Sequence, residues 1–462
     1  MKIIYGLTNG IVLQRGNDSR VNSYIELKGE GAVSVKLYGP PILAKTVTIE
    51  ELEGNGERRR FRLGGIPAGG PYTVELFVGN ESEIFSDVYV GDVWLLAGQS
   101  NMQGLGANHK VAGNYTNPCI RYYNFQNEYK TAHPSTLHLV QRSPNEDFKT
   151  WQGRPELESP NFKTTGPGYF FAEEMYRRTA VPQGLIPCAI GGSPLFNWKK
   201  EQIEGVPNFY VYALERFREC GANVRGIFWY QGCSDAMENV AEHFTDNMIE
   251  LVNNFRRDFS SPDLPFVQVQ IFCCTHDDPI FNKHWASVRD QQRTLSEKIH
   301  NLDTVATTDA ELDDSIHLSG DYQMKVGKNA AESMYHLCFD PMGARSTLAP
   351  QLDSVYLLPY SLDGCPTVAI KFKNLNGRLT SLGRPAGFAI STDSDSIPNQ
   401  KFARVELHND TAYLYCYAME PWELKNYYLS YMLSNTVYAN VTDEDGRPIP
   451  AFGPIYLGDI FQ

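Results

Sequence analysis

Residues 93–102 read Val93-Trp94-Leu95-Leu96-Ala97-Gly98-Gln99-Ser100-Asn101-Met102. Five apolar residues that run straight into a glycine are typical of a strand buried on both faces and ended by a turn. Apolar runs of the same kind follow at 184–190, 224–229 and 265–271. Helical patterns separate or follow them at 244–255, 285–299 and 319–339. Strands alternating with helices predict a parallel sheet covered on both faces, with sites at the carboxyl ends of its strands.

The chain on either side of this region has a different period. Apolar and polar residues alternate at 33–38 and 72–78, and again at 367–372 and 411–417, which is typical of half-buried strands. A chain of 462 residues also exceeds one ordinary core. We therefore predict three domains: an N-terminal β-sandwich (1–90), an α/β domain (91–344) and a C-terminal β-rich sandwich module (345–462).

Composition excludes several classes of protein. The formal net charge is −13, so the average surface repels nucleic acid. No run of eighteen apolar residues predicts a membrane span, and the first residues lack the apolar stretch of a secretory signal, so we expect a cytoplasmic protein. The nine cysteines are dispersed and odd in number, which favours reduced thiols. Cys273, Cys274 and His276 lack zinc-site spacing, and we predict no metal.

Ser100 lies just beyond the first buried strand, where a helix can open. Unpaired N–H groups at a helix start stabilise an oxyanion, so Ser100 is a candidate nucleophile. The alternative is a serine that caps the helix, which local sequence alone favours. A nucleophilic serine needs a histidine base, and His317 has the strongest context because Asp314 precedes it by three residues, a spacing that lets a carboxylate orient the ring.

Two further segments end strands at the same predicted edge. Gly191-Gly192 offers backbone N–H groups, and the alternative is a plain turn. Trp229-Tyr230-Gln231-Gly232 offers an amide donor beside aromatic rings that could stack on a sugar, and the alternative is a buried core segment. Residues 105–165 are rich in aromatics without a steady period, as in a lid, a substrate loop or a surface excursion.

Together these blocks resemble the SGNH hydrolase superfamily, and more closely its sialate O-acetylesterase and carbohydrate esterase family 6 group. Gly98-Gln99-Ser100-Asn101-Met102, the Gly-Gly pair, Trp229-Tyr230-Gln231-Gly232 and the Asp-x-x-His motif at 314–317 occur in the family's order. Residues 10–15 also resemble the family's N-terminal signature. The resemblance implies a flavodoxin-like parallel sheet and removal of O-acetyl groups from carbohydrate, without cofactor, nucleic-acid partner or membrane partner.

The resemblance also implies a role for each matching residue. Ser100 would be the nucleophile, His317 the general base and Asp314 the orienting carboxylate. The oxyanion donors would be the backbone N–H groups of Ser100 and Gly192 and the side chain of Gln231. The residues expected to contact the substrate are Asn101, Trp229 and Tyr230.

One position departs from the family pattern. Relatives commonly have glutamate where this chain has Cys233, and in some that glutamate supports the histidine. Asp314 is then the expected orienting residue, with Asp313 in reserve. Cys233 itself is a poor candidate nucleophile, because no neighbouring cation would lower its pKa. The leading hypothesis is a sialate O-acetylesterase. The alternatives are an esterase for acetylxylan or other acetylated oligosaccharides, a lipase-like esterase that prefers longer acyl chains, and a sugar-binding homologue with impaired catalysis.

Overall fold

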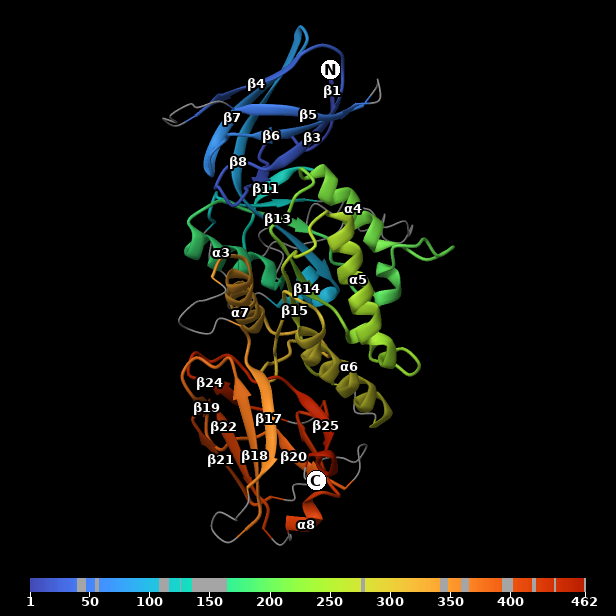
Figure 1. The fold of residues 1–462 in the computed structure, drawn as a ribbon, viewed down its shortest axis with the longest axis vertical. Helices are drawn as coiled ribbons and strands as arrows, with labels where there is room; N and C mark the ends of the chain where they lie inside the picture. Colours follow the sequence, from blue (N-terminus) through green and yellow to red (C-terminus); the bar gives the residue numbers. More distant parts are fainter. Residues whose placement is uncertain are drawn as a thin grey trace.

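The computed structural model describes residues 1–39, 47–54, 58–107, 116–124, 126–134, 164–275, 279–340, 348–358, 365–392, 402–417, 421–435 and 438–460. Figure 1 shows an elongated molecule with N-terminal strands at one end, helices around a sheet in the middle and C-terminal strands at the other end. Much of the predicted irregular segment, 108–115 and 135–163, lies outside the described residues, as does His276.

The N-terminal strands form one separate sheet and one extension of the central sheet. The separate sheet has the order β1-β3-β6-β5. The strands are β1 (Lys2–Tyr5), β2 (Val12–Gln14), β3 (Ser23–Lys28), β4 (Val33–Tyr38), β5 (Thr48–Gly54), β6 (Arg59–Gly64), β7 (Gly69–Val78) and β8 (Glu81–Gly98).

Strand β8 joins the N-terminal region to the central sheet. Its first half pairs antiparallel with β7, and its second half pairs in parallel with two strands of the central sheet. The domain boundary predicted between residues 90 and 91 therefore falls inside one continuous strand. An ion pair beside this point links the two regions, because Asp92 of β8 is buried and accepts from both Arg15 (2.8 and 2.9 Å) and Arg225 (3.2 Å).

The central sheet positions the candidate site. It contains β8, β10 (Ile120–Tyr123), β11 (Tyr129–Thr131), β13 (Gln183–Pro187), β14 (Gly226–Tyr230), β15 (Phe266–Val269) and β16 (Leu302–Val305). The parallel strands β13-β8-β14-β15-β16 have the 2-1-3-4-5 order of flavodoxin-like sheets, with β10 added beside β13. The sheet is mixed rather than wholly parallel as predicted. Strands β7 and β11 run antiparallel, because a short turn can join only antiparallel neighbours.

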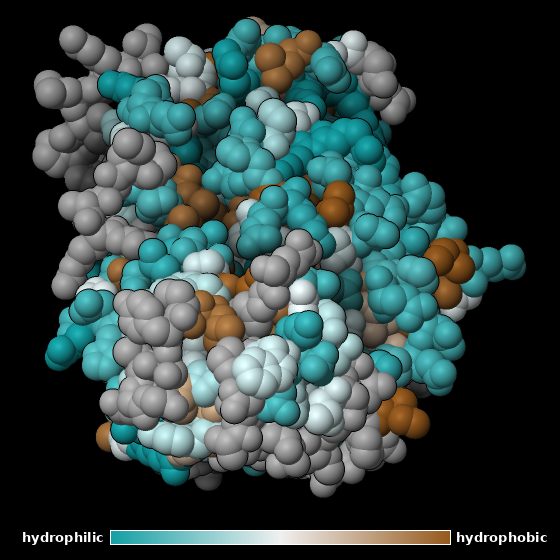
Figure 2. Space-filling view, turned by 60° about the horizontal axis from the view of Figure 1, so that its bottom comes forward, coloured by the Kyte–Doolittle hydropathy of each residue, from teal (hydrophilic) through white to brown (hydrophobic). Residues whose placement is uncertain are grey.

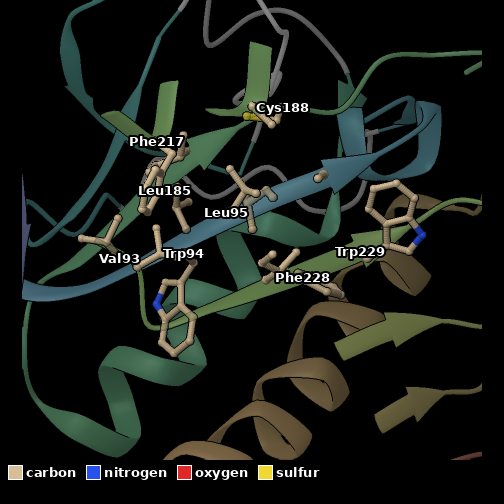
Figure 3. Packing of buried hydrophobic residues seen from close by; sticks show 14 of the residues in the cluster. Val93, Trp94, Leu95, Leu185, Cys188, Phe217, Phe228 and Trp229 are labelled. Carbon is tan, nitrogen blue, oxygen red and sulfur yellow. The ribbon is translucent and has the colours of Figure 1, made fainter. Parts of the chain in front are cut away.

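Helices cover both faces of this sheet. They are α1 (Ser100–Gln103), α3 (Pro167–Thr179), α4 (Phe209–Glu219), α5 (Phe244–Asp258), α6 (Pro279–Lys298) and α7 (Gly320–Phe339). In Figure 1, α3 and α7 lie on one side, and α4 and α5 on the other. Figure 3 shows the alternation that fills both faces: Trp94 and Phe228 point to one side, and Phe217 lies on the other near Leu185. On the first side, Phe171 of α3 contacts Trp94 and Phe228, with ring centroids 5.2 and 5.0 Å apart.

Short elements complete the central region. They are β9 (Gly106–Ala107), β12 (Thr164–Thr165), and the 3-10 turns η2 (Leu195–Trp198), η3 (Cys233–Asp235) and η4 (Ala241–His243). Strands β9 and β12 pair with each other. None of the helices in the described ranges combines the length and apolar character needed to cross a bilayer.

The C-terminal region has a hydrophobic core of its own. Its elements are β17 (Gln351–Leu357), β18 (Thr367–Lys373), β19 (Leu379–Ser381), β20 (Phe388–Ser391), β21 (Arg404–His408), β22 (Thr411–Tyr415), α8 (Pro421–Leu424), β23 (Tyr428–Tyr431), β24 (Val441–Asp443), β25 (Phe452–Tyr456) and η5 (Leu457–Asp459). The strands form sheets ordered β17-β18-β22-β21, β20-β23-β25 and β19-β24. The predicted boundary at 344/345 lies outside the described residues, and the sandwich arrangement of both flanking modules stays a prediction. On the face seen in Figure 2, hydrophobic residues form separate patches among hydrophilic ones.

Candidate active site

Ser100 follows the end of β8, where three strand ends meet. The carbonyl of Gly98 accepts the N–H of Ile190 (2.9 Å), and the carbonyl of Tyr230 accepts the N–H of Gln99 (2.9 Å). Gly98 has φ +130°, and a Cβ there would lie 2.2 Å from the Tyr230 carbonyl oxygen, so only glycine fits this turn. Gln99 is the N-cap and Ser100 is the first residue of α1, 7% exposed. Ser100 is therefore not the capping residue that local sequence favoured.

His317 and Asp314 lie in the loop between β16 and α7 and are in direct contact. Asp314 Oδ2 is 2.6 Å from His317 Nδ1, and Asp314 Oδ1 accepts the backbone N–H groups of Ile316 (2.8 Å) and His317 (2.7 Å). Burial acts to raise the pKa of Asp314, but these hydrogen bonds outweigh it and the pKa is lowered. A carboxylate held in this way fixes the ring so that Nε2 is the free nitrogen.

The adjacent Asp313 has a different set of contacts. Its Oδ2 accepts the backbone N–H groups of Ala107 (2.8 Å) and Gly320 (3.0 Å). Asp313 thus fastens the histidine loop to β9 and to the start of α7. Of the two carboxylates, the structure places Asp314 against the imidazole.

Asn101 connects the serine turn to the histidine loop. Its Oδ1 accepts from Leu318 N (3.0 Å) and Gln323 Nε2 (2.8 Å), and its Nδ2 donates to the Ile316 carbonyl (3.4 Å). Asn101 follows Ser100 directly, and Ile316 and Leu318 flank His317, so these bonds bring the predicted nucleophile and base into one neighbourhood. The side chain is 2% exposed, and the three bonds described for it are all to protein groups.

The two glycines after β13 lie beside the serine. A Cβ on Gly191 would be 3.5 Å from Ser100 Cβ, and Gly191 N donates to Gln103 Oε1 (2.8 Å). Gly192 has φ +72°, and among the described residues, its two chain neighbours aside, no atom lies within 4 Å of the position its Cβ would take. In the part of the chain that the structure describes, neither Ser100 N–H nor Gly192 N–H has a protein acceptor. Both groups are thus available to an incoming oxyanion.

The segment after β14 differs from its predicted role. Gln231 is fully buried, and its Nε2 donates to the Ser193 carbonyl (3.1 Å) and to the Asp235 carboxylate. Both amide hydrogens are used, so Gln231 is not free to serve as an oxyanion donor. Trp229 and Tyr230 are 0% and 1% exposed, and the Trp229 ring packs against Trp198 with centroids 4.9 Å apart. Adjacent strands and helices cover both rings, so neither presents a face to solvent in this structure.

The Cys233 thiol and the Asp235 carboxyl group, which follow β14, both have raised pKa values. Burial raises the pKa of the Cys233 thiol, and the neighbouring Cys274 adds to the effect, so Cys233 is not a thiolate nucleophile. Burial also raises the pKa of Asp235 to about 6, against hydrogen bonds from Gln231 and from Leu195 N. Sequence reasoning missed Asp235, whose carboxylate joins the loops after β13 and β14. Its position two residues after Cys233 was the available signal.

The site residues come from the carboxyl ends of the parallel strands, as a flavodoxin-like sheet predicts. Among the described residues, no cluster of three or more His, Cys, Asp or Glu side chains is arranged to hold a metal ion. The arrangement that the structure does show is a serine at a helix start, a carboxylate-oriented histidine, and two unpaired backbone donors. This set is suited to acyl transfer.

Comparison with known proteins identifies carbohydrate esterases among the relatives of this chain. A probable carbohydrate esterase of Arabidopsis thaliana is 27% identical over 272 residues, covering 55% of this chain and 94% of that protein. Sialate O-acetylesterases of Pongo abelii and Homo sapiens are each 24% identical over 300 residues, and the match spans 52% of this chain and about half (53%) of theirs.

A solved structure shares the fold along nearly the whole chain. A carbohydrate acetylesterase from Xanthomonas citri superposes with a TM-score of 0.73 at 21% identity, covering 97% of this chain and 99% of that one. The sequence model of the carbohydrate esterase, sialic acid-specific acetylesterase family matches residues 90–336. The predicted family and enzyme class are thereby confirmed: the chain belongs to the sialic acid-specific acetylesterase family of carbohydrate esterases and is a carboxylic ester hydrolase.

Proposed function

We propose that the protein is a serine esterase that removes O-acetyl groups from sialic acid, with Ser100 as nucleophile, His317 as general base and Asp314 as the residue that orients His317. The observation that carries this proposal is the Asp314–His317 contact of 2.6 Å in a loop that Asn101 ties to Ser100. A histidine oriented by a carboxylate beside a serine at a helix start is the arrangement that acyl transfer requires.

The reaction follows from these positions. His317 Nε2 takes the Ser100 hydroxyl proton as Oγ bonds to the acetyl carbonyl carbon. The negative charge that develops on the carbonyl oxygen is met by the N–H groups of Ser100 and Gly192. His317 then gives its proton to the sugar oxygen as the ester C–O bond breaks. Water, deprotonated by His317, attacks the acetyl-enzyme, which releases acetate and restores Ser100.

Asp314 acts on the histidine at both steps. Its carboxylate accepts from Nδ1 and stabilises the imidazolium that forms when the serine proton is taken. The hydrogen bonds that lower the pKa of Asp314 favour the ionised form that this role requires. Asp314 thus supplies the carboxylate that Cys233 cannot. In the proposed mechanism the triad therefore does not depend on the family glutamate.

The choice of sugar rests on the family and its relatives. The family is named for sialic acid, and two relatives are sialate O-acetylesterases, which favours an acetylated sialic acid as substrate. Acetylxylan or another acetylated oligosaccharide is the second candidate, because the name of the Arabidopsis relative specifies a carbohydrate esterase without naming the sugar. A sugar-binding homologue without catalysis would need the catalytic set to be disrupted, and Asp314 and His317 are in contact instead.

Acetate release tests the proposal directly. Wild type and Ser100→Ala should be assayed side by side on O-acetylated sialic acids and acetylated xylo-oligosaccharides, with longer acyl esters as a further comparison. We expect acetate from the sialic acids, and a loss of several orders of magnitude in Ser100→Ala and in His317→Ala. Faster acetate release from xylo-oligosaccharides than from sialic acids would change the proposed substrate and leave the proposed mechanism unchanged. Unchanged release in Ser100→Ala would refute the mechanism, and no release by folded wild type would favour the binding homologue.

A further inference from the structure

A large cavity lies at the junction between the N-terminal sheet and the helices of the central region. Its volume is about 840 Å³, and its walls come from β1, β3, β5 and β6 on one side and from the ends of α4 and α5 on the other. The two sides are joined by backbone hydrogen bonds, Gly6 N to Glu219 O (3.1 Å) and Tyr24 N to Gly221 O (2.8 Å). The cavity is therefore built between two regions that are fixed to each other.

This cavity is separate from the candidate active site. It is lined by Phe217 and Phe259, at the C-terminal ends of α4 and α5. Each of these helices leads into the next parallel strand, so its C-terminal end lies at the amino edge of the sheet. Ser100 and His317 follow the carboxyl ends of strands. A ligand in the cavity would bind at the opposite edge from the proposed chemistry.

Four aromatic side chains are among the residues that line the cavity. Tyr5 and Tyr24 line it, and the Arg60 guanidinium lies 4.6 Å from the centroid of the Tyr24 ring. Phe217 and Phe259 stack with centroids 3.7 Å apart and planes inclined by 2°. The described structure records no hydrogen bond for the hydroxyl groups of Tyr5 and Tyr24. These hydroxyls can therefore bind a ligand.

Three arginines and three carboxylates line the cavity, so its formal charges balance. Arg58 pairs with Glu26 (3.4 Å), and Asp258 accepts from Lys200 and from the Tyr210 hydroxyl (2.8 Å each). The remaining charged side chains of the lining form no ion pair in the described part of the chain; they are Arg60, Arg218 and Glu53. Arg60 is also the cross-strand neighbour of both Glu26 and Glu53. The wall thus presents hydrogen-bond donors and acceptors side by side.

We propose that this cavity is a non-catalytic binding site for a short, uncharged oligosaccharide. Sugar hydroxyls both donate and accept hydrogen bonds, which matches guanidinium and carboxylate groups placed together, and the apolar face of a sugar ring packs on tyrosine. An apolar ligand would desolvate these charges, and a lining with equal numbers of arginines and carboxylates offers no excess of either sign to an ionic ligand. The volume is within the range of about 300–1,000 Å³ that small-molecule sites occupy. The site would hold a neighbouring part of a glycan while an acetyl group is removed elsewhere.

Calorimetric titration with xylohexaose, cellohexaose, lactose and sialyllactose tests this proposal. Arg218→Ala and Tyr24→Ala remove one donor and one ring from the cavity, and Arg177→Ala is a matched control, because Arg177 is an exposed arginine of α3 whose partner is Glu174. We expect a neutral hexasaccharide to bind wild type, with Kd raised about tenfold in the first two variants and unchanged in the control. Hydrolysis of p-nitrophenyl acetate should stay at the wild-type rate in all three.

Several results would overturn the proposal. One is the absence of binding by either neutral hexasaccharide. Another is binding that survives both cavity variants, or that an active-site acetylated sugar displaces, since the ligand would then occupy the catalytic site. Binding of sialyllactose but not lactose, lost in Arg218→Ala, would make the site one for carboxylated sugars. These measurements use unacetylated sugars and do not depend on whether the protein releases acetate.

Discussion

Asn101→Ala should uncouple the serine turn from the histidine loop. The change removes the acceptor of Leu318 N–H and of Gln323 Nε2, both of which lie in a buried region. A buried donor left without a partner costs about 1–3 kcal/mol. We therefore expect the free energy of unfolding to fall by about 2–4 kcal/mol, with partial rescue by water.

The effect on catalysis separates positioning from substrate binding. If His317 moves by about 1 Å relative to Ser100, turnover should fall about 100-fold with little change in KM. The measurement is steady-state kinetics on an acetyl ester, combined with urea unfolding. Asn208→Ala is the matched control, because Asn208 caps α4 through Val211 N (3.0 Å), and its loss should cost about 1 kcal/mol without changing kcat. A raised KM at unchanged kcat in Asn101→Ala would refute the positioning role.

Three further predictions concern the carboxylates and Cys233. Asp314→Asn should lower kcat about 100-fold and move the acid limb of the pH–rate profile to lower pH, because the carboxylate that stabilises the imidazolium is lost. Asp313→Asn should instead lower the melting temperature and leave the pH–rate profile unchanged. If Asp313→Asn shifts the profile instead, the assignment within the pair is wrong. Cys233→Ser should retain activity and iodoacetamide should not inactivate wild type, since burial raises the thiol pKa; inactivation would contradict this. Because burial raises the pKa of Asp235 to about 6, the folded state holds this proton more tightly than the unfolded state does. As the pH rises from about 4 to 6, the stability of wild type relative to Asp235→Asn should therefore fall by about 3 kcal/mol, and it should stay level above about pH 6. A difference in unfolding free energy between the two proteins, measured in urea, that does not change across this window would contradict the prediction.

The central fold could be predicted because its signals are local. Apolar runs at 93–97 and 265–271 and the helical pattern at 319–339 depend on burial and periodicity, which hold wherever the segment is placed. The position of Ser100 after a strand and the spacing of Asp314 and His317 are likewise local features. Sequence could not show that β8 continues through the predicted boundary at 90/91. Both halves read as strand, and the second half is held in the central sheet by β13 and β14, which lie far along the chain.

The sequence by itself determined the kind of chemistry: a serine after a buried strand, an Asp-x-x-His motif, and a family resemblance that the comparisons confirm. Tertiary structure decided what each neighbouring side chain does. Asp313 and Asp314 are adjacent and chemically equal, and only the folded loop turns one toward backbone N–H groups and the other toward the imidazole. Trp229 and Gln231 likewise suit a sugar site by residue type, but surrounding strands and helices bury the ring and the Asp235 contact occupies the amide. Residue type sets which bonds a side chain can form, and the distant segments packed against it decide which bonds it does form.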